Sequence, residues 1–197
     1  NNSYLEEKDD YQGGNLLPKG WASSLLLSVA ILGLTIQPMV LNSETALQRG
    51  ITDSLPPTTL QAESFLNQTP PEGRSLIDWV RTINVYPEPD NHIGQPANIT
   101  GFVVHINHLP ENIIYLSRFV LTCCAVDAYP VGILVELPTP RQEFPPDTWL
   151  EVQGVMNTAT LPPLERINED SQRERRYVVL RAEVVKTIPT PRNPYGV

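Results

Sequence analysis

One apolar stretch near the N-terminus constrains this chain more than any other feature of its sequence. Residues Gly20–Ser43 carry no charged side chain, and Leu25–Leu34 presents apolar side chains on every face of a helix. A helix that is apolar all round has to be buried in protein or in lipid. About 20 residues of helix cross the hydrocarbon core of a bilayer, and Trp21–Val40 supplies that length. We therefore predict a transmembrane helix over residues 20–42.

Two other interpretations of this stretch stay open, a cleaved secretory signal and a helix buried inside a domain. A signal needs a small-residue cleavage motif behind it, and Ser43–Ala46 offers only a weak one. A buried helix of about 20 uncharged residues is long for a domain of this size. Pro38 can kink or end the helix, and an apolar segment that stops at Ile36 is only just long enough to span.

The segments on either side of the apolar stretch are polar. Residues 1–19 are predicted to form a polar loop or tail, and a chain that starts at Asn1 is expected to be processed or part of a longer product. Residues 43–73 are predicted to be a proline-rich connector, because the Pro-Pro steps at Pro56 and Pro70 extend the chain and hold a domain away from a bilayer.

A β-rich domain is predicted over residues 74–190, followed by a C-terminal tail over residues 191–197. Ser75 is a capping residue, and apolar residues at helical spacing follow it to Asn84, so a short helix comes first. Gly101 and Gly154 lie inside predicted strands and are expected to mark bulges or tight bends. Five runs with strand-like alternation follow the helix: Ala97–Ile106, Ile114–Cys124, Val131–Leu137, Trp149–Thr158 and Tyr177–Ile188. Five short strands without long helices between them predict a small antiparallel barrel, with an open half-sandwich as the alternative.

Charge and motifs exclude several classes of protein. The formal net charge of −8 opposes a nucleic-acid surface, which needs a positive field. Arg173, Arg175 and Arg176 form a basic cluster that acidic residues interrupt, and we interpret it as a solvated loop. The chain has no glycine-rich phosphate loop and no GxSxG elbow, and its three histidines leave few general bases. We therefore do not expect an enzyme.

The most distinctive local sequence contains two adjacent cysteines. Neighbouring side chains of a strand point to opposite faces, so Cys123 and Cys124 serve one site only if the strand bends there. Asp127 begins a turn-forming sequence that permits such a bend. A thiolate and this carboxylate would suit zinc, with His105 and His108 completing the ligand set. The alternative is that the cysteines are small buried hydrophobes and Asp127 caps a turn.

At these residues the chain resembles the YcgQ-like family of bacterial membrane proteins, which are described as permease subunits. The resemblance covers roughly residues 20–190. The matching features are Leu76–Trp79, Ile93–Gly94, Gly101–Val103, Arg118–Phe119, Cys123–Cys124, Asp127–Ala128, Pro130–Gly132 and Trp149–Gly154. The resemblance implies an OB-like barrel for the soluble domain, a multi-span permease-like partner, and a second helix upstream of the one present here. The family core reads closer to Cys-Cys-x-Ala-Asp-Ala, so Val126 is a small departure.

The expected function is therefore that of a membrane-anchored accessory or binding subunit that contacts the lipid bilayer and a permease-like partner. A stand-alone thiol-dependent protein for metal handling or redox chemistry is one alternative, and a structural tether without a ligand is another. Lys19 lies closer to the span than Arg49, which favours an extracytoplasmic soluble domain by the positive-inside rule. A free thiol pair suits an oxidising compartment less well.

Overall fold

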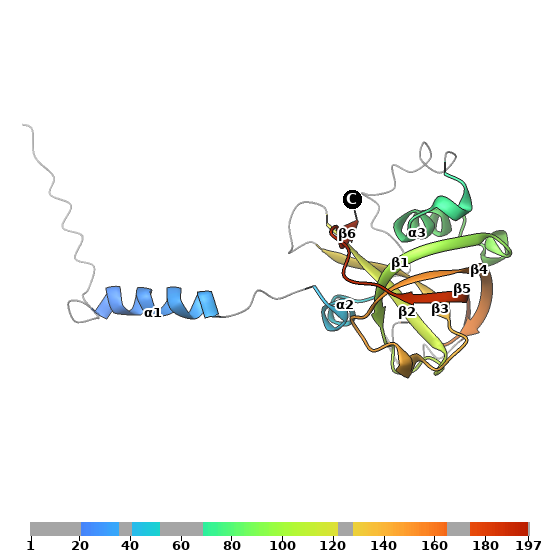
Figure 1. Ribbon diagram of the computed structural model, residues 1–197. Helices are drawn as coiled ribbons and strands as arrows, with labels where there is room; N and C mark the ends of the chain where they lie inside the picture. The colour runs from blue at the N-terminus through green and yellow to red at the C-terminus, as the bar shows by residue number, and fades with distance from the viewer. Residues whose placement is uncertain (1–20, 36–40, 52–68, 122–127, 165–173, 197) are drawn as a thin grey trace, which may run out of the picture. The chain divides into compact units, whose positions relative to one another are not determined.

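The computed structural model describes residues 21–35, 41–51, 69–121, 128–164 and 174–196, and these belong to two separate units (Figure 1). The first unit, Asn1–Val40, contains helix α1 (Trp21–Thr35). Seven of its large apolar side chains are between 54% and 69% exposed: Trp21, Leu25, Leu26, Leu27, Val29, Ile31 and Leu32. Within the described ranges, no helix is long and apolar enough to cross a membrane. The predicted span also includes residues 36–40, which lie outside the described residues.

The second unit, Leu41–Val197, begins with a helix that the sequence did not predict. Helix α2 (Ser43–Arg49) lies in the predicted connector, and Asn42 caps it by accepting a hydrogen bond from the Thr45 amide at 2.9 Å. Ala46 of this helix is fully buried. The amide of Ser43 donates to the Asp147 carboxylate at 2.6 Å, so the helix is fastened to the rest of the unit. The start of the predicted connector is therefore part of the folded domain.

Helix α3 (Leu76–Val85) forms where the sequence predicted it. Ser75 and Asp78 make a capping box, in which each side chain accepts a hydrogen bond from the backbone amide of the other residue. Leu76, Trp79 and their apolar neighbours are buried against the sheet. Short 3-10 turns precede and follow this helix and interrupt a later loop: η2 (Pro71–Gly73), η3 (Pro89–His92) and η5 (Arg141–Glu143).

A mixed sheet forms the body of the second unit. Its strands are β1 (Pro96–Val104), β2 (Ile113–Val120), β3 (Tyr129–Glu136), β4 (Trp149–Leu161), β5 (Arg175–Thr187) and the short β6 (Tyr195–Gly196). They pair in the order β1-β4-β5-β3-β2-β6, and β1 also pairs with β2, so the pairings of the five long strands close on themselves. Both the predominance of strands and the short helix before them are confirmed.

The prediction of a purely antiparallel sheet is wrong, because β5 runs parallel to β3 and β6 runs parallel to β2. After β3 the chain crosses to a position beside β1 to form β4, and β5 then returns antiparallel to β4. That return places β5 between β4 and β3 and gives it the direction of β3. The predicted C-terminal tail contains β6, which pairs with the end of β2.

Buried side chains lie on both faces of the sheet, and one face is partly exposed along β4 and β5. One cluster joins α3 to alternate residues of all five long strands, including Ile114 and Val131. The other contains Ala46 of α2 and the residues of opposite parity, such as Tyr115 and Phe119. Figure 1 shows α2 and α3 at different sides of the strands. The bulge expected at Gly154 is confirmed, because the register between β4 and β5 shifts between Gln153 and Gly154.

Candidate functional site

The predicted cysteine site falls in a part of the chain that the structure does not describe. Cys123, Cys124 and Asp127 lie within residues 122–127, outside the described residues. The chain is described on both sides of this segment: Val120 at the end of β2 pairs with Tyr129 at the start of β3. The proposed ligation by these three residues therefore stays a prediction.

The two histidines of the predicted ligand set lie near the other end of β2. His105 and His108 follow β1, whose residue Val104 pairs with Tyr115 near the start of β2. With eight residues at about 3.3 Å each, β2 spans roughly 25 Å. The Nε2–H of His105 donates to the carbonyl of Phe144 at 2.9 Å, and that of His108 donates to the carbonyl of Pro163 at 2.6 Å.

Each imidazole is therefore hydrogen-bonded to a backbone carbonyl of a different segment. In the described ranges, no group of three or more histidine, cysteine, aspartate or glutamate residues is arranged to hold a metal ion.

Several residues that carry the resemblance to the YcgQ-like family meet in an aromatic cluster, which we call the Arg118 cluster (Phe102, Arg118, Phe119 and Trp149). The rings of Phe102 and Phe119 stack with centroids 5.4 Å apart, and the Trp149 ring meets Phe102 edge-on at 5.8 Å. The Arg118 guanidinium carbon lies 5.7 Å from the Trp149 ring centroid, within range of a cation–π interaction. Burial lowers the pKa of Arg118, because removing the guanidinium from water disfavours its charge.

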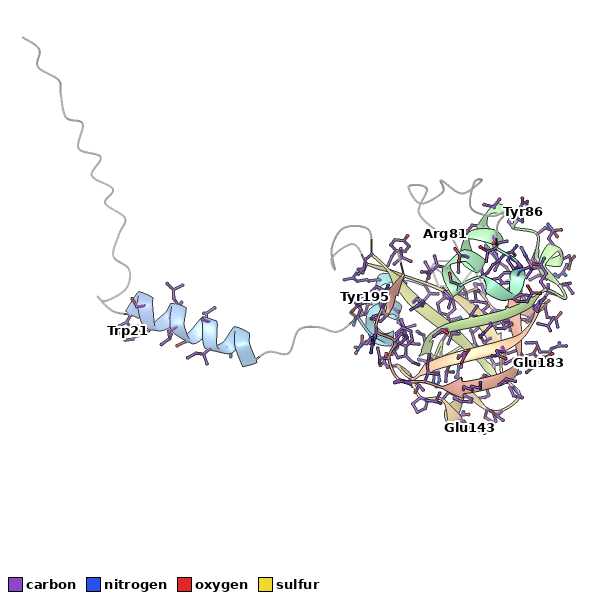
Figure 2. All side chains as sticks on the ribbon, turned by 45° about the horizontal axis from the view of Figure 1, so that its top comes forward. Trp21, Arg81, Tyr86, Glu143, Glu183 and Tyr195 are labelled. Atoms are coloured by element: carbon purple, nitrogen blue, oxygen red, sulfur yellow. The ribbon has the colours of Figure 1, made fainter. Side chains whose placement is uncertain are left out.

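The Arg118 cluster fastens the C-terminal segment to β2. The guanidinium of Arg118 donates through Nη2 to the carbonyl of Asn193 at 2.7 Å, and Phe119 pairs with Tyr195 of β6. Figure 2 shows the Tyr195 side chain on this strand. Two further motif residues have structural surroundings: the Ala128 carbonyl accepts a hydrogen bond from Arg49, and Pro130 lies opposite Phe119. Arg118 and Phe119 therefore contact the C-terminal segment, and Ala128 contacts the segment that contains α2.

A pocket of about 370 Å³ lies between β3, β5 and the chain that follows α3, and we call it the β3–β5 pocket. β3 and β5 pair only over Leu134–Glu136 and Val179–Arg181. Gly132–Leu134 and Arg175–Val178 line the pocket where this pairing stops. Asn84 and Pro87, on either side of the Tyr86 labelled in Figure 2, line it from the α3 side.

The lining of the β3–β5 pocket combines apolar, aromatic and basic side chains. Tyr115, only 1% exposed, and Tyr177 contribute aromatic rings. Arg176 forms an ion pair with Asp90, with Nη1 lying 3.2 Å from Oδ2. The hydrogen bond that Arg176 donates to the Asp90 carboxylate raises the pKa of Arg176. Arg175 makes no ion pair with any residue that the structure describes.

The sequence did not indicate this pocket. The sequence predicts Arg175 and Arg176 in a solvated loop; both are exposed as expected, but they begin β5 and line the pocket. The sequence feature that could have indicated basic residues at the start of a strand is the pair of adjacent arginines ahead of an apolar run. The pocket itself depends on the order of the strands, which local alternation does not reveal.

The second unit is a small β-rich domain with a mixed sheet. Its five long strands pair in a closed order, α3 packs on the sheet, and the β3–β5 pocket lies beside it. The chain belongs to the DUF1980 C-terminal domain family, whose model matches residues 75–196. The matched region runs from the cap of α3 to the end of β6 and so includes the short strand in the predicted tail. No curated protein matches the chain.

Proposed function

We propose that the chain is a membrane-anchored accessory subunit that acts beside a permease-like, multi-span membrane protein. The exposed surface of α1 is the observation that carries this proposal. Its seven large apolar side chains from Trp21 to Leu32 are all more than half exposed. Burying one such side chain contributes roughly 1.5–3 kcal/mol, so their transfer into lipid or against a partner is strongly favourable. Contiguous apolar surface of this kind marks a membrane or protein contact.

The sequence around α1 supports a full crossing in this proposal. The fifteen residues of α1 at about 1.5 Å each correspond to roughly 22 Å, against about 30 Å of hydrocarbon. Uncharged sequence continues from Thr35 to Ser43 and is long enough to cover the difference, with Gln37 and Asn42 as its polar amide side chains. Lys19 is the cation closest to this stretch, which favours an extracytoplasmic globular unit.

The domain behind the anchor fits a binding or docking role. The closed order of strand pairing supports an OB-like barrel, as the resemblance to the YcgQ-like family implies. The same resemblance supports the permease-like partner. A fold of this kind does not by itself specify a ligand. The net charge of −8 opposes nucleic acid as that ligand.

Purification from native membranes tests the partnership. The full chain, tagged at its C-terminus and extracted in mild detergent, is expected to bring down one multi-span protein in a fixed ratio. A variant with Leu27→Arg and Ile31→Arg should lose that protein, because charges in α1 oppose its apolar contacts. A chain that purifies alone, even after cross-linking in intact membranes, would refute the proposal.

Zinc titration of the same preparation tests the alternative of a stand-alone metal-handling protein. Wild type, Cys123→Ser and Cys124→Ser are compared. Tight binding by wild type that both variants lose would favour the alternative, and equally weak binding by all three would eliminate it.

A further inference from the structure

We infer that the β3–β5 pocket binds a small organic anion, a molecule with a carboxylate or similar group on an aromatic or apolar body. The pocket lies entirely within the second unit. The inference goes beyond the proposed function and does not depend on anchoring, so either can fail without the other.

The opening follows from the way the strands are connected. β3 pairs along its whole length with β2, and β5 pairs along its whole length with β4. Between β3 and β5, however, the pairing is limited to three residues of each strand. Tyr129–Ile133 and Arg175–Val178 therefore diverge from each other. The volume of about 370 Å³ falls within the range of small-molecule sites, roughly 300–1,000 Å³.

Gly132 allows an aromatic ring to form part of the pocket wall. A Cβ atom at this residue would lie 2.7 Å from Cε1 of Tyr115 and 2.3 Å from the carbonyl oxygen of Leu116. Since no side chain is present there, the Tyr115 ring packs directly against the β3 backbone. Pro87 and Pro89 line the wall on the α3 side. Rigid apolar and aromatic walls of this kind suit a flat or apolar ligand body.

The charge in the pocket points to an anion. Its described lining includes Arg175 and Arg176 and no acidic side chain, although the chain as a whole carries a net charge of −8. Asp90 already neutralises Arg176 and holds it in place. Arg175 has no such partner among the described residues, so its guanidinium is available to a ligand. The planar fork of a guanidinium matches a carboxylate with two parallel hydrogen bonds.

Calorimetric titration of the full chain in non-ionic detergent tests this site with three probes. The probe 2-naphthoate carries both the anion and the aromatic body, 2-naphthamide lacks the charge, and inorganic phosphate lacks the aromatic body. Heats from detergent alone are subtracted. Each probe is added to wild type, to Arg175→Gln and to the matched control Arg181→Gln, which changes an exposed arginine of the same strand outside the pocket.

We expect wild type and Arg181→Gln to bind 2-naphthoate with similar affinity and to bind 2-naphthamide and phosphate more weakly. Arg175→Gln should bind 2-naphthoate about tenfold more weakly or worse, because a charge-assisted pair is lost. Equal binding of 2-naphthoate by wild type and Arg175→Gln would overturn the inference. Equal binding of the charged and neutral naphthalenes, phosphate binding as tight as that of 2-naphthoate, or no binding at millimolar concentration would overturn it as well.

Discussion

Replacing Gly154 with alanine gives the sharpest test of how β4 and β5 fit together. An ideal Cβ at residue 154 would lie 2.0 Å from the carbonyl oxygen of Arg181, 2.9 Å from its carbonyl carbon and 3.1 Å from Cα of Ala182. All three are backbone atoms of β5, so no side chain can rotate away to make room. Gly154 is not among the residues with positive φ, and close contact is therefore the reason for glycine here.

The magnitude follows from the displacement that alanine would require. Ordinary contact begins near 3.4 Å, so β5 would have to move by about 1.4 Å, more than the roughly 0.5 Å range of a good N–H···O hydrogen bond. Overpacking costs about 1–3 kcal/mol, and a broken buried hydrogen bond costs a similar amount. We expect a net loss of about 2–4 kcal/mol. Chain entropy alone would predict the opposite sign, a gain of about 0.4–1 kcal/mol.

Urea unfolding of the full chain in mild detergent, followed by tryptophan fluorescence, measures this loss. With a slope of about 2 kcal/mol per molar urea, the midpoint for Gly154→Ala should fall by roughly 1–2 M. Gly73→Ala is the matched control, because its Cβ would meet no backbone atom, only side-chain atoms of Thr69 at 3.3 Å and Pro70 at 4.0 Å. If the two variants unfold at the same urea concentration, the argument for close backbone contact at the bulge is wrong.

Three further substitutions test local contacts. Ser75→Ala removes the capping box of α3 and should lower the free energy of unfolding by about 1 kcal/mol in the same urea assay, and an unchanged midpoint would contradict this. Arg118→Gln removes the hydrogen bond to Asn193 and should speed amide exchange in β6, so unchanged protection there would count against that contact. Asp147→Ala removes the acceptor for the Ser43 amide and should speed exchange in α2 relative to α3, whereas equal rates would show that this bond is dispensable.

Local sequence was sufficient to predict most strands because turn residues and alternation are local signals. β4 begins at Trp149 as predicted, but it continues past Thr158 to Leu161. The added residues pair with the first residues of β5, starting at Arg175. A strand end that depends on a partner elsewhere in the chain cannot be found from its own alternation.

Local sequence patterns did not predict the elements that depend on tertiary contacts. The seven residues of α2 carry no apolar stripe, and this helix is held by the Asn42 cap and the contact with Asp147. The pairing of β6 with β2 and the parallel direction of β5 are also consequences of chain topology. The β3–β5 pocket exists because of that topology, so it could not be predicted from the spacing of residues.

Sheet register is a further property that residue spacing does not give. His105 and His108 follow β1 near the start of β2, while Cys123 lies outside the described residues, so the predicted ligand set stays a prediction. Spacing alone gives no register, and register decides which loop ends share one edge of a sheet. Arg118, Phe119 and Trp149, which the resemblance singled out, do meet in the fold.

Alkaline carbonate washing of native membranes tests most directly whether α1 anchors the chain. We predict that wild type stays in the membrane pellet and that Leu27→Arg with Ile31→Arg moves into the supernatant, because each central arginine costs about 2.5–3.5 kcal/mol on insertion scales. Leu47→Arg, an exposed position on α2, is the control and should remain in the pellet. Release of wild type by the wash, or full retention of the double variant, would contradict the account.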